Sequence, residues 1–68
     1  MKLLDFVQGL RNQSVVILTK QNYTMRGTVA NVDAYMNVYL RDAEALYDGR
    51  PPIKTPVLIV RGSTIRDI

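Results

Sequence analysis

The sequence contains no cysteine and no histidine among its 68 residues. Without cysteine, neither a disulfide framework nor a thiolate metal site can form. Without histidine, the chain lacks the commonest general base and the commonest imidazole metal ligand. A domain this small buries a modest fraction of its surface, and small domains without disulfides or metals often depend on oligomerisation. We therefore expect one small domain, without a cofactor, that assembles with other chains.

Long apolar runs and enzyme-like motifs are also missing. No apolar run is long enough to span a bilayer. Residues 1–4 resemble the start of a signal peptide, but polar residues then interrupt the apolar stretch and no small-residue cleavage site follows. The sequence has no P-loop, and its acidic residues show no spacing typical of a general acid and base. We expect an intracellular protein that is not an enzyme.

The net charge of +3 and the isoelectric point near 9.6 describe a mildly basic chain. Such a charge is compatible with a polyanionic partner but does not identify one.

Apolar residues near the start recur at the i, i+3, i+4 and i+7 spacing of one helix face. They are Leu3, Phe6, Val7 and Leu10. This pattern predicts an amphipathic helix over about residues 2–11. So short a helix is marginal by itself, so we expect its apolar stripe to pack on the rest of the domain.

Strand-like segments fill the remainder of the sequence, with polar or glycine-containing turns between them. The predicted strands are 14–19, 23–32, 36–46, 55–60 and 64–68, and residues 47–54 form a loop. Gly27 lies inside the long second strand, where a glycine marks a bulge or a bend. Together these features predict an all-β fold with a short N-terminal helix, namely a five-stranded, strongly bent antiparallel barrel.

The fourth and fifth strands carry no lysine that would guard an exposed edge. Residues 57–60 are wholly apolar, and residues 65–68 are apolar at alternate positions. Apolar edges favour strand pairing with another chain. If the fourth strand of one subunit pairs with the fifth strand of the next, the head-to-tail contact closes into a ring.

Two segments carry a family resemblance. Gly27-x-Val-x-x-Val-Asp-x-x-Met-Asn-x-x-Leu40 resembles the first Sm motif, and Val60-Arg-Gly-Ser-Thr-Ile65 resembles the second. With both motifs in order behind a helix and a strand, the chain resembles Sm and Sm-like (LSm) proteins over essentially its whole length. The opening residues 1–4 and the closing residues 61–66 are similar to the D-class Sm proteins and their LSm paralogues.

The resemblance implies a single Sm/LSm domain over residues 1–68. Within it, the helix covers about 2–11, the first Sm motif about 14–46, the loop 47–54 and the second Sm motif about 55–68. It further implies a six- or seven-membered ring of identical or paralogous subunits that binds U-rich single-stranded RNA at its pore. Such rings serve in small nuclear ribonucleoprotein cores, mRNA splicing or other RNA processing. The location would be nuclear and cytoplasmic in a eukaryote, or cytoplasmic in a prokaryote.

The two motifs also imply RNA-binding residues. Tyr35 would stack on a base, and Arg61 would stack on its opposite face. Asn37 offers a donor and an acceptor to the edge of uracil. Gly62 would let the backbone approach the base closely, or would permit a positive φ in the turn. Asp33, which would repel phosphate, would instead support Asn37 or the loop backbone.

Each of these residues also has a purely structural interpretation. Tyr35 would then pack on its own hairpin, Asn37 would serve turn geometry, and Arg61 would be a solvated charge at a strand end. The other tyrosines, namely Tyr23, Tyr39 and Tyr47, are interpreted as barrel or subunit-contact residues.

Three alternatives to an RNA-binding subunit of a ribonucleoprotein remain open at this point. The first is a ring-forming assembly module that does not itself bind RNA. The second is a homomeric prokaryotic LSm RNA chaperone. The third is a monomeric barrel of the OB or SH3-like type.

Overall fold

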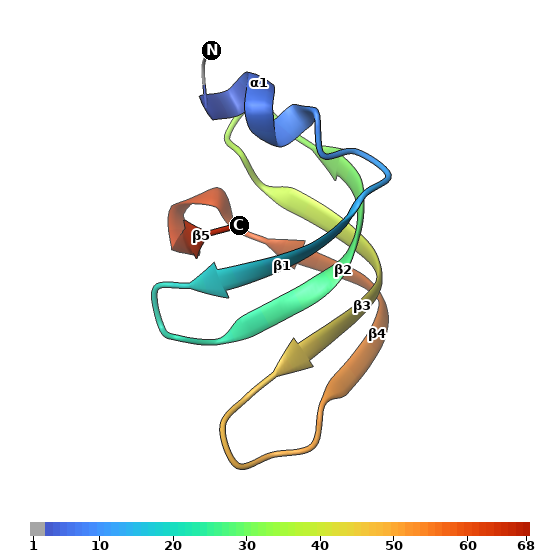
Figure 1. The fold of residues 1–68 in the computed structure, drawn as a ribbon, viewed down its shortest axis with the longest axis vertical. Coiled ribbons are helices and arrows are strands. Elements are labelled where there is room, and N and C mark those ends of the chain that lie inside the picture. The colour runs from blue at the N-terminus through green and yellow to red at the C-terminus, as the bar shows by residue number, and fades with distance from the viewer. Residues whose placement is uncertain (1–2) are drawn as a thin grey trace.

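The computed structural model describes residues 3–68, in which a short helix precedes five strands (Figure 1). The elements are α1 (Leu3–Gln8), β1 (Ser14–Thr19), β2 (Thr24–Val32), β3 (Val38–Leu46), β4 (Ile53–Val60), the 3-10 turn η1 (Gly62–Thr64) and β5 (Ile65–Asp67). The strands form one antiparallel sheet in the order β4-β3-β2-β1-β5. The predicted fold, a bent five-stranded sheet behind an N-terminal helix, is confirmed.

The helix is shorter than predicted, ending at Gln8 instead of residue 11, and the predicted residue 2 lies outside the described part. Beyond it the backbone hydrogen bonds span three residues instead of four: Leu10 N donates to Val7 O, and Arg11 N donates to Gln8 O. Such i to i−3 bonds close the last turn of a helix. Asn12 then takes a positive φ of 66° and turns the chain into β1.

The predicted apolar stripe of the helix is correct at Val7 and wrong at Phe6. Val7 is only 1% exposed and belongs to the core, whereas the Phe6 side chain is 45% exposed. The reason is that α1 covers one end of the curled sheet and contacts it with one side only (Figure 1). In the subunit by itself, the opposite side of the helix faces solvent.

Three strand boundaries also differ from the predictions. β3 begins at Val38 instead of residue 36, because Met36, with a positive φ of 65°, still belongs to the turn, where its N–H donates to Asp33 O. β4 begins at Ile53 instead of residue 55, because Ile53 already pairs with Ala45, so the loop is shorter than 47–54. β5 begins at Ile65 instead of residue 64, because the preceding three residues form η1.

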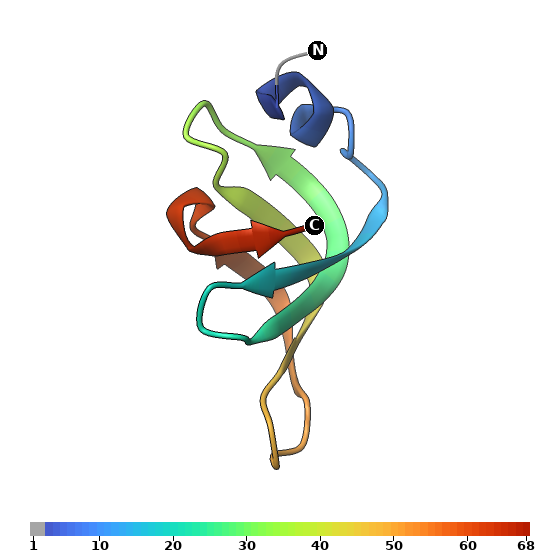
Figure 2. The same ribbon diagram turned by 60° about the vertical axis from the view of Figure 1, so that its left-hand side comes forward.

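Gly27 marks the bend of the sheet, as predicted. The register between β2 and β3 shifts between Arg26 and Thr28, so Gly27 lies at a bulge. A Cβ atom at this position would lie 3.0 Å from Arg41 O and 3.1 Å from Ala43 Cα. The missing side chain therefore lets β2 and β3 approach closely where the sheet curls (Figure 2).

The curled sheet encloses a small core that is closed at one end by the helix. Its buried members are Val7, Ile17, Val29, Val32, Val38, Leu40, Ala43 and Val60. The two edge strands are β4 and β5, which confirms the predicted edges. β4 exposes the large apolar side chains of Ile53, Val57 and Ile59. The free edge thus combines unpaired backbone groups with exposed apolar side chains.

Candidate functional site

The tip between β2 and β3 is a compact turn built around Asp33. Met36 N donates to Asp33 O at 3.0 Å, and Asp33 N donates to Asn37 O at 3.2 Å. The Asp33 carboxylate reinforces this turn, because Oδ1 accepts from Tyr35 N at 2.9 Å and from Asn37 N at 3.0 Å. Aspartate favours turns because its short side chain can accept from the backbone just beyond it. The turn is therefore stabilised by hydrogen bonds among its own residues.

The second oxygen of the same carboxylate orients side chains. Asp33 Oδ2 accepts from Asn37 Nδ2 at 2.9 Å and from the Tyr39 hydroxyl at 3.3 Å. Desolvation acts to raise the pKa of the Asp33 carboxyl, but the hydrogen bonds from Asn37, Tyr35 and Tyr39 outweigh it and hold the pKa below its ordinary value. Asp33 therefore supports Asn37 as an ionised carboxylate.

The side chain of Asn37 joins this tip to the turn after β4. Its Oδ1 accepts from Gly62 N at 2.8 Å, while its Nδ2 donates to Asp33. These two partners fix the orientation of the Asn37 amide. The Gly62 N–H can bond only to the amide oxygen, and the Asp33 carboxylate can bond only to the amide N–H group. One N–H and one lone pair of the Asn37 amide remain for a ligand. Asn37 thus serves both the turn geometry and the link between the tips.

Gly62 is where the backbones of the two tips touch. A Cβ atom at this position would lie 2.3 Å from Tyr35 O and 2.8 Å from both Met36 C and Met36 O. Gly62 does not have a positive φ, since the positive-φ glycine of the described chain is Gly49, so that interpretation of the glycine is wrong. The close approach it permits is to the β2–β3 tip, and any side chain would push the tips apart.

The joined tips enclose a shallow hollow of about 410 Å³. Its lining residues are Tyr35, Asn37, Arg61 and Ser63. The Tyr35 side chain is 83% exposed, so the alternative in which it packs on its own hairpin is wrong. The carbonyl of Arg61 accepts from Thr64 N and Thr64 Oγ1, which fixes the backbone while the side chain stays exposed. The hollow therefore combines an aromatic ring, an amide and a guanidinium.

Two residues of this site were not predicted. Tyr39 was interpreted as a barrel or subunit-contact residue, yet its hydroxyl donates to Asp33. The signal was available, because residues two apart on a strand share one face, and Tyr39 follows Asn37 by two. Ser63 lines the hollow only because η1 turns it there, and no pattern in the sequence indicates this.

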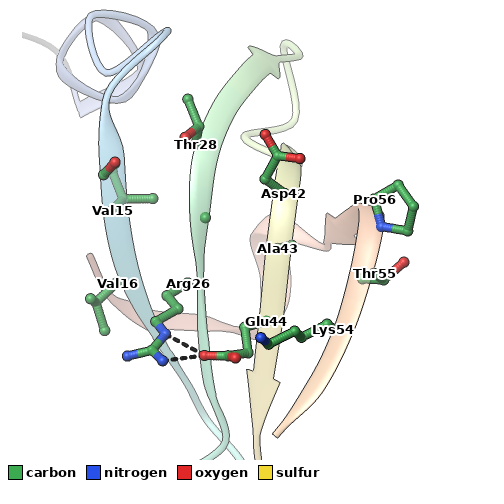
Figure 3. A pocket seen from close by; sticks show the side chains of 12 residues that line it. Val15, Val16, Arg26, Thr28, Asp42, Ala43, Glu44, Lys54, Thr55 and Pro56 are labelled. Carbon is green, nitrogen blue, oxygen red and sulfur yellow. Dashed lines mark hydrogen bonds and ion pairs between the residues drawn. The ribbon is translucent and has the colours of Figure 1, made fainter.

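A larger hollow of about 730 Å³ crosses β1 to β4 at the Gly27 bend (Figure 3). It contains none of the tip residues. Arg26 and Glu44, which face each other across β2 and β3, already form an ion pair there. Because these opposite charges satisfy one another, this open surface is a weaker ligand site than the hollow between the tips.

The lowered pKa of Asp33 predicts a pH dependence of stability. A depressed carboxyl pKa in the folded state adds stability above the pKa of the unfolded chain, and this is lost as the pH falls through the folded pKa. We expect the melting temperature to fall below about pH 4, where carboxyls begin to protonate. Asp33→Asn should weaken this fall, whereas Asp48→Asn in the exposed β3–β4 loop should not. Identical pH profiles for the two variants and the parent would contradict the expectation.

Comparison with known proteins places the chain among Sm-like proteins. A putative snRNP Sm-like protein of Pyrococcus horikoshii is 29% identical over 62 residues, covering 91% of this chain and 83% of that protein. An Sm protein of Pyrococcus abyssii, solved in complex with a uridine heptamer, is 25% identical with a TM-score of 0.85, covering 98% and 94% of the two chains. A heptameric archaeal Sm protein is 26% identical with a TM-score of 0.75, covering 90% and 88%.

The model of the LSM domain, a family of non-catalytic proteins, matches residues 5–68. The match spans nearly the whole sequence and includes both motifs. It confirms the resemblance and the non-enzymatic character that were predicted from the sequence. The chain therefore belongs to the LSM domain family.

Proposed function

We propose that this chain is a subunit of a ring that binds U-rich single-stranded RNA at its central pore. The observation that carries the proposal is the hollow between the two tips, where Asn37 bonds to both Asp33 and Gly62 beside the exposed side chains of Tyr35 and Arg61. The uridine heptamer bound to the similar Pyrococcus abyssii protein supports this choice of ligand.

Each side chain has a distinct role in the proposed site. Tyr35 and Arg61 stack on the two faces of a base, a contact that tolerates any base. The free N–H and lone pair of Asn37 pair with one carbonyl and the N3–H of uracil, and this contact selects uracil. Asp33 and Tyr39 hold the Asn37 amide in place, and Gly62 lets the two tips meet.

The ring would assemble by pairing β4 of one subunit with β5 of the next. The free edges of both strands and the apolar side chains exposed on β4 support this arrangement. The heptameric archaeal Sm protein favours seven subunits over six. The archaeal relatives also favour the prokaryotic alternative, a cytoplasmic RNA-binding ring, over a nuclear role in splicing.

Affinities of the assembled ring for oligo-U and oligo-C, each seven nucleotides long, test the roles of the site. Tyr35→Ala should weaken binding of both RNAs roughly 5- to 150-fold for each occupied site, since stacking contributes about 1–3 kcal/mol per base. Tyr35→Phe keeps the stacking ring and should bind like the parent. Because Tyr35 is highly exposed, neither change should lower the melting temperature.

Asn37→Ala is the test of base selection in the same assay. It should reduce the ratio of the oligo-U to the oligo-C affinity toward one. An unchanged ratio would rule out Asn37 as the uracil-reading residue. A stable ring that binds neither RNA would instead support the assembly module without RNA binding.

A further inference from the structure

Two arginines outside the hollow are each anchored by an asparagine. Arg11 Nη2 donates to Asn31 Oδ1 at 2.8 Å, and Arg41 Nη1 donates to Asn12 Oδ1 at 3.3 Å. All four side chains are exposed. Within residues 3–68 the one ion pair joins Arg26 to Glu44, so neither anchored arginine is paired with a carboxylate.

The fold brings these arginines to one surface by running the α1–β1 connection alongside β2. Asn12 N donates to Val29 O at 2.7 Å, and Val29 N donates to Gln13 O at 2.9 Å, which fixes the connection beside that strand. The next residue of β2, Thr28, pairs with Arg41 of β3. The connection therefore carries Arg11 to β2, while β3 presents Arg41 to the connection.

Anchoring by a neutral amide has a specific electrostatic result. An amide oxygen occupies one of the five N–H donors of a guanidinium and leaves its full positive charge uncompensated. The remaining donors form a planar fork that matches the oxygens of a phosphate. The acidic residues nearest in sequence are Asp5, in the first turn of α1, and Asp42, which lines the hollow at the Gly27 bend. Within the described residues, neither forms an ion pair with Arg11 or Arg41. The surface is thus basic and partly preorganised.

Paired residues connect this surface to the tips. Asn31, which accepts from Arg11, is paired with Tyr39 across β2 and β3. The Tyr39 hydroxyl in turn donates to Asp33, which supports Asn37. Tyr39 and Asn31 thus connect the tip residue Asp33 to Arg11.

We propose that Arg11 and Arg41 form a second RNA contact, which binds backbone phosphates of the strand beyond the hollow without regard to the base. The proposal rests on the proposed function for its class of ligand. Its test, however, does not require the uridine site, because an RNA of any base carries the same phosphates.

The experiment measures how the affinity of the assembled ring depends on RNA length and salt concentration. The variant is Arg11→Gln/Arg41→Gln, and the RNAs are U7, U20 and A20. We expect U7 binding to be unchanged, because it fills only the pore sites. Binding of U20 and A20 should weaken about tenfold at low salt. The slope of log affinity against log salt should fall by about 1.4 for each subunit whose two phosphate contacts are lost.

Matched variants separate this contact from general charge loss. Arg50→Gln, an exposed arginine in the β3–β4 loop, should leave all three affinities unchanged. Arg11→Lys/Arg41→Lys keeps both charges and should retain most of the salt slope. Equal losses for U7 and U20, a similar loss with Arg50→Gln, or no loss for U20 and A20 would each overturn the proposal. Failure of the uridine site would show separately, as equal binding of U7 and C7 by the parent ring.

Discussion

Gly62→Ala is expected to separate the two tips and to abolish uridine selection. The added methyl would lie 2.3 Å from the Tyr35 carbonyl oxygen, and because its neighbours are backbone atoms they cannot rotate away. The tips must move apart, which breaks the bond from Gly62 N to Asn37 Oδ1. Overpacking of this kind costs about 1–3 kcal/mol of folding free energy. Loss of the stacked base should weaken oligo-U binding by roughly 5- to 150-fold per site.

The matched control for this change is Gly49→Ala in the β3–β4 loop. A Cβ atom at position 49 meets nothing within 4 Å, but the φ of +71° there is unfavourable for alanine. This variant should lose about 1 kcal/mol of stability and none of its RNA affinity. Thermal melting and oligo-U titration of both variants check the expectation. Parent-like oligo-U affinity in Gly62→Ala would show that contact between the tips is not needed for binding.

Ile59→Lys on β4 is expected to dissociate the ring into monomers. Ile59 is 53% exposed on a strand that has a free edge, so its side chain is available for the contact with the next subunit. Lysine guards edge strands against pairing, and burying its unpaired charge in a contact costs several kcal/mol. The monomer would also bind oligo-U weakly, because a ring gains affinity from several linked sites.

Val16→Lys is the control for the same apolar-to-lysine change. Val16 is 58% exposed, but it lies on β1, which pairs with both β2 and β5 and has no free edge. Native mass spectrometry should show the ring for this variant and the monomer for Ile59→Lys. A ring of full size with Ile59→Lys, or equal dissociation of both variants, would argue against assembly through β4.

Local patterns in the sequence were sufficient for the architecture of the domain. The pattern of apolar residues predicted where strands form, and Gly27, a glycine inside a strand, predicted where the sheet bends. Boundaries were less accurate. The start of β3 depends on the positive φ of Met36, and the start of β4 depends on pairing of Ile53 with Ala45. Both depend on how turns close between strands, which residue type alone does not determine.

For the candidate site, too, the sequence predicted part of the arrangement and the structure supplied the rest. The motifs identified Tyr35, Asn37 and Arg61, and the structure places all three around one hollow. The motifs did not indicate that Asn37 already bonds to Gly62, because these residues are 25 positions apart and meet only when the sheet curls. This contact changes the expected chemistry, since half of the amide is committed to the protein and only the remainder can meet a base.

The sequence by itself determined the strand pattern, the bend at Gly27, the family motifs and the chemical types of the site residues. These are local properties, set by the side chains and by their order along the chain. Only the tertiary structure decided that position 62 must be glycine, because a side chain there would collide with the Tyr35 carbonyl oxygen. It also decided that Arg11 and Arg41 lie on one surface. Those relations join residues on different strands, so they depend on curvature and register, which arise only when the whole sheet packs around its core.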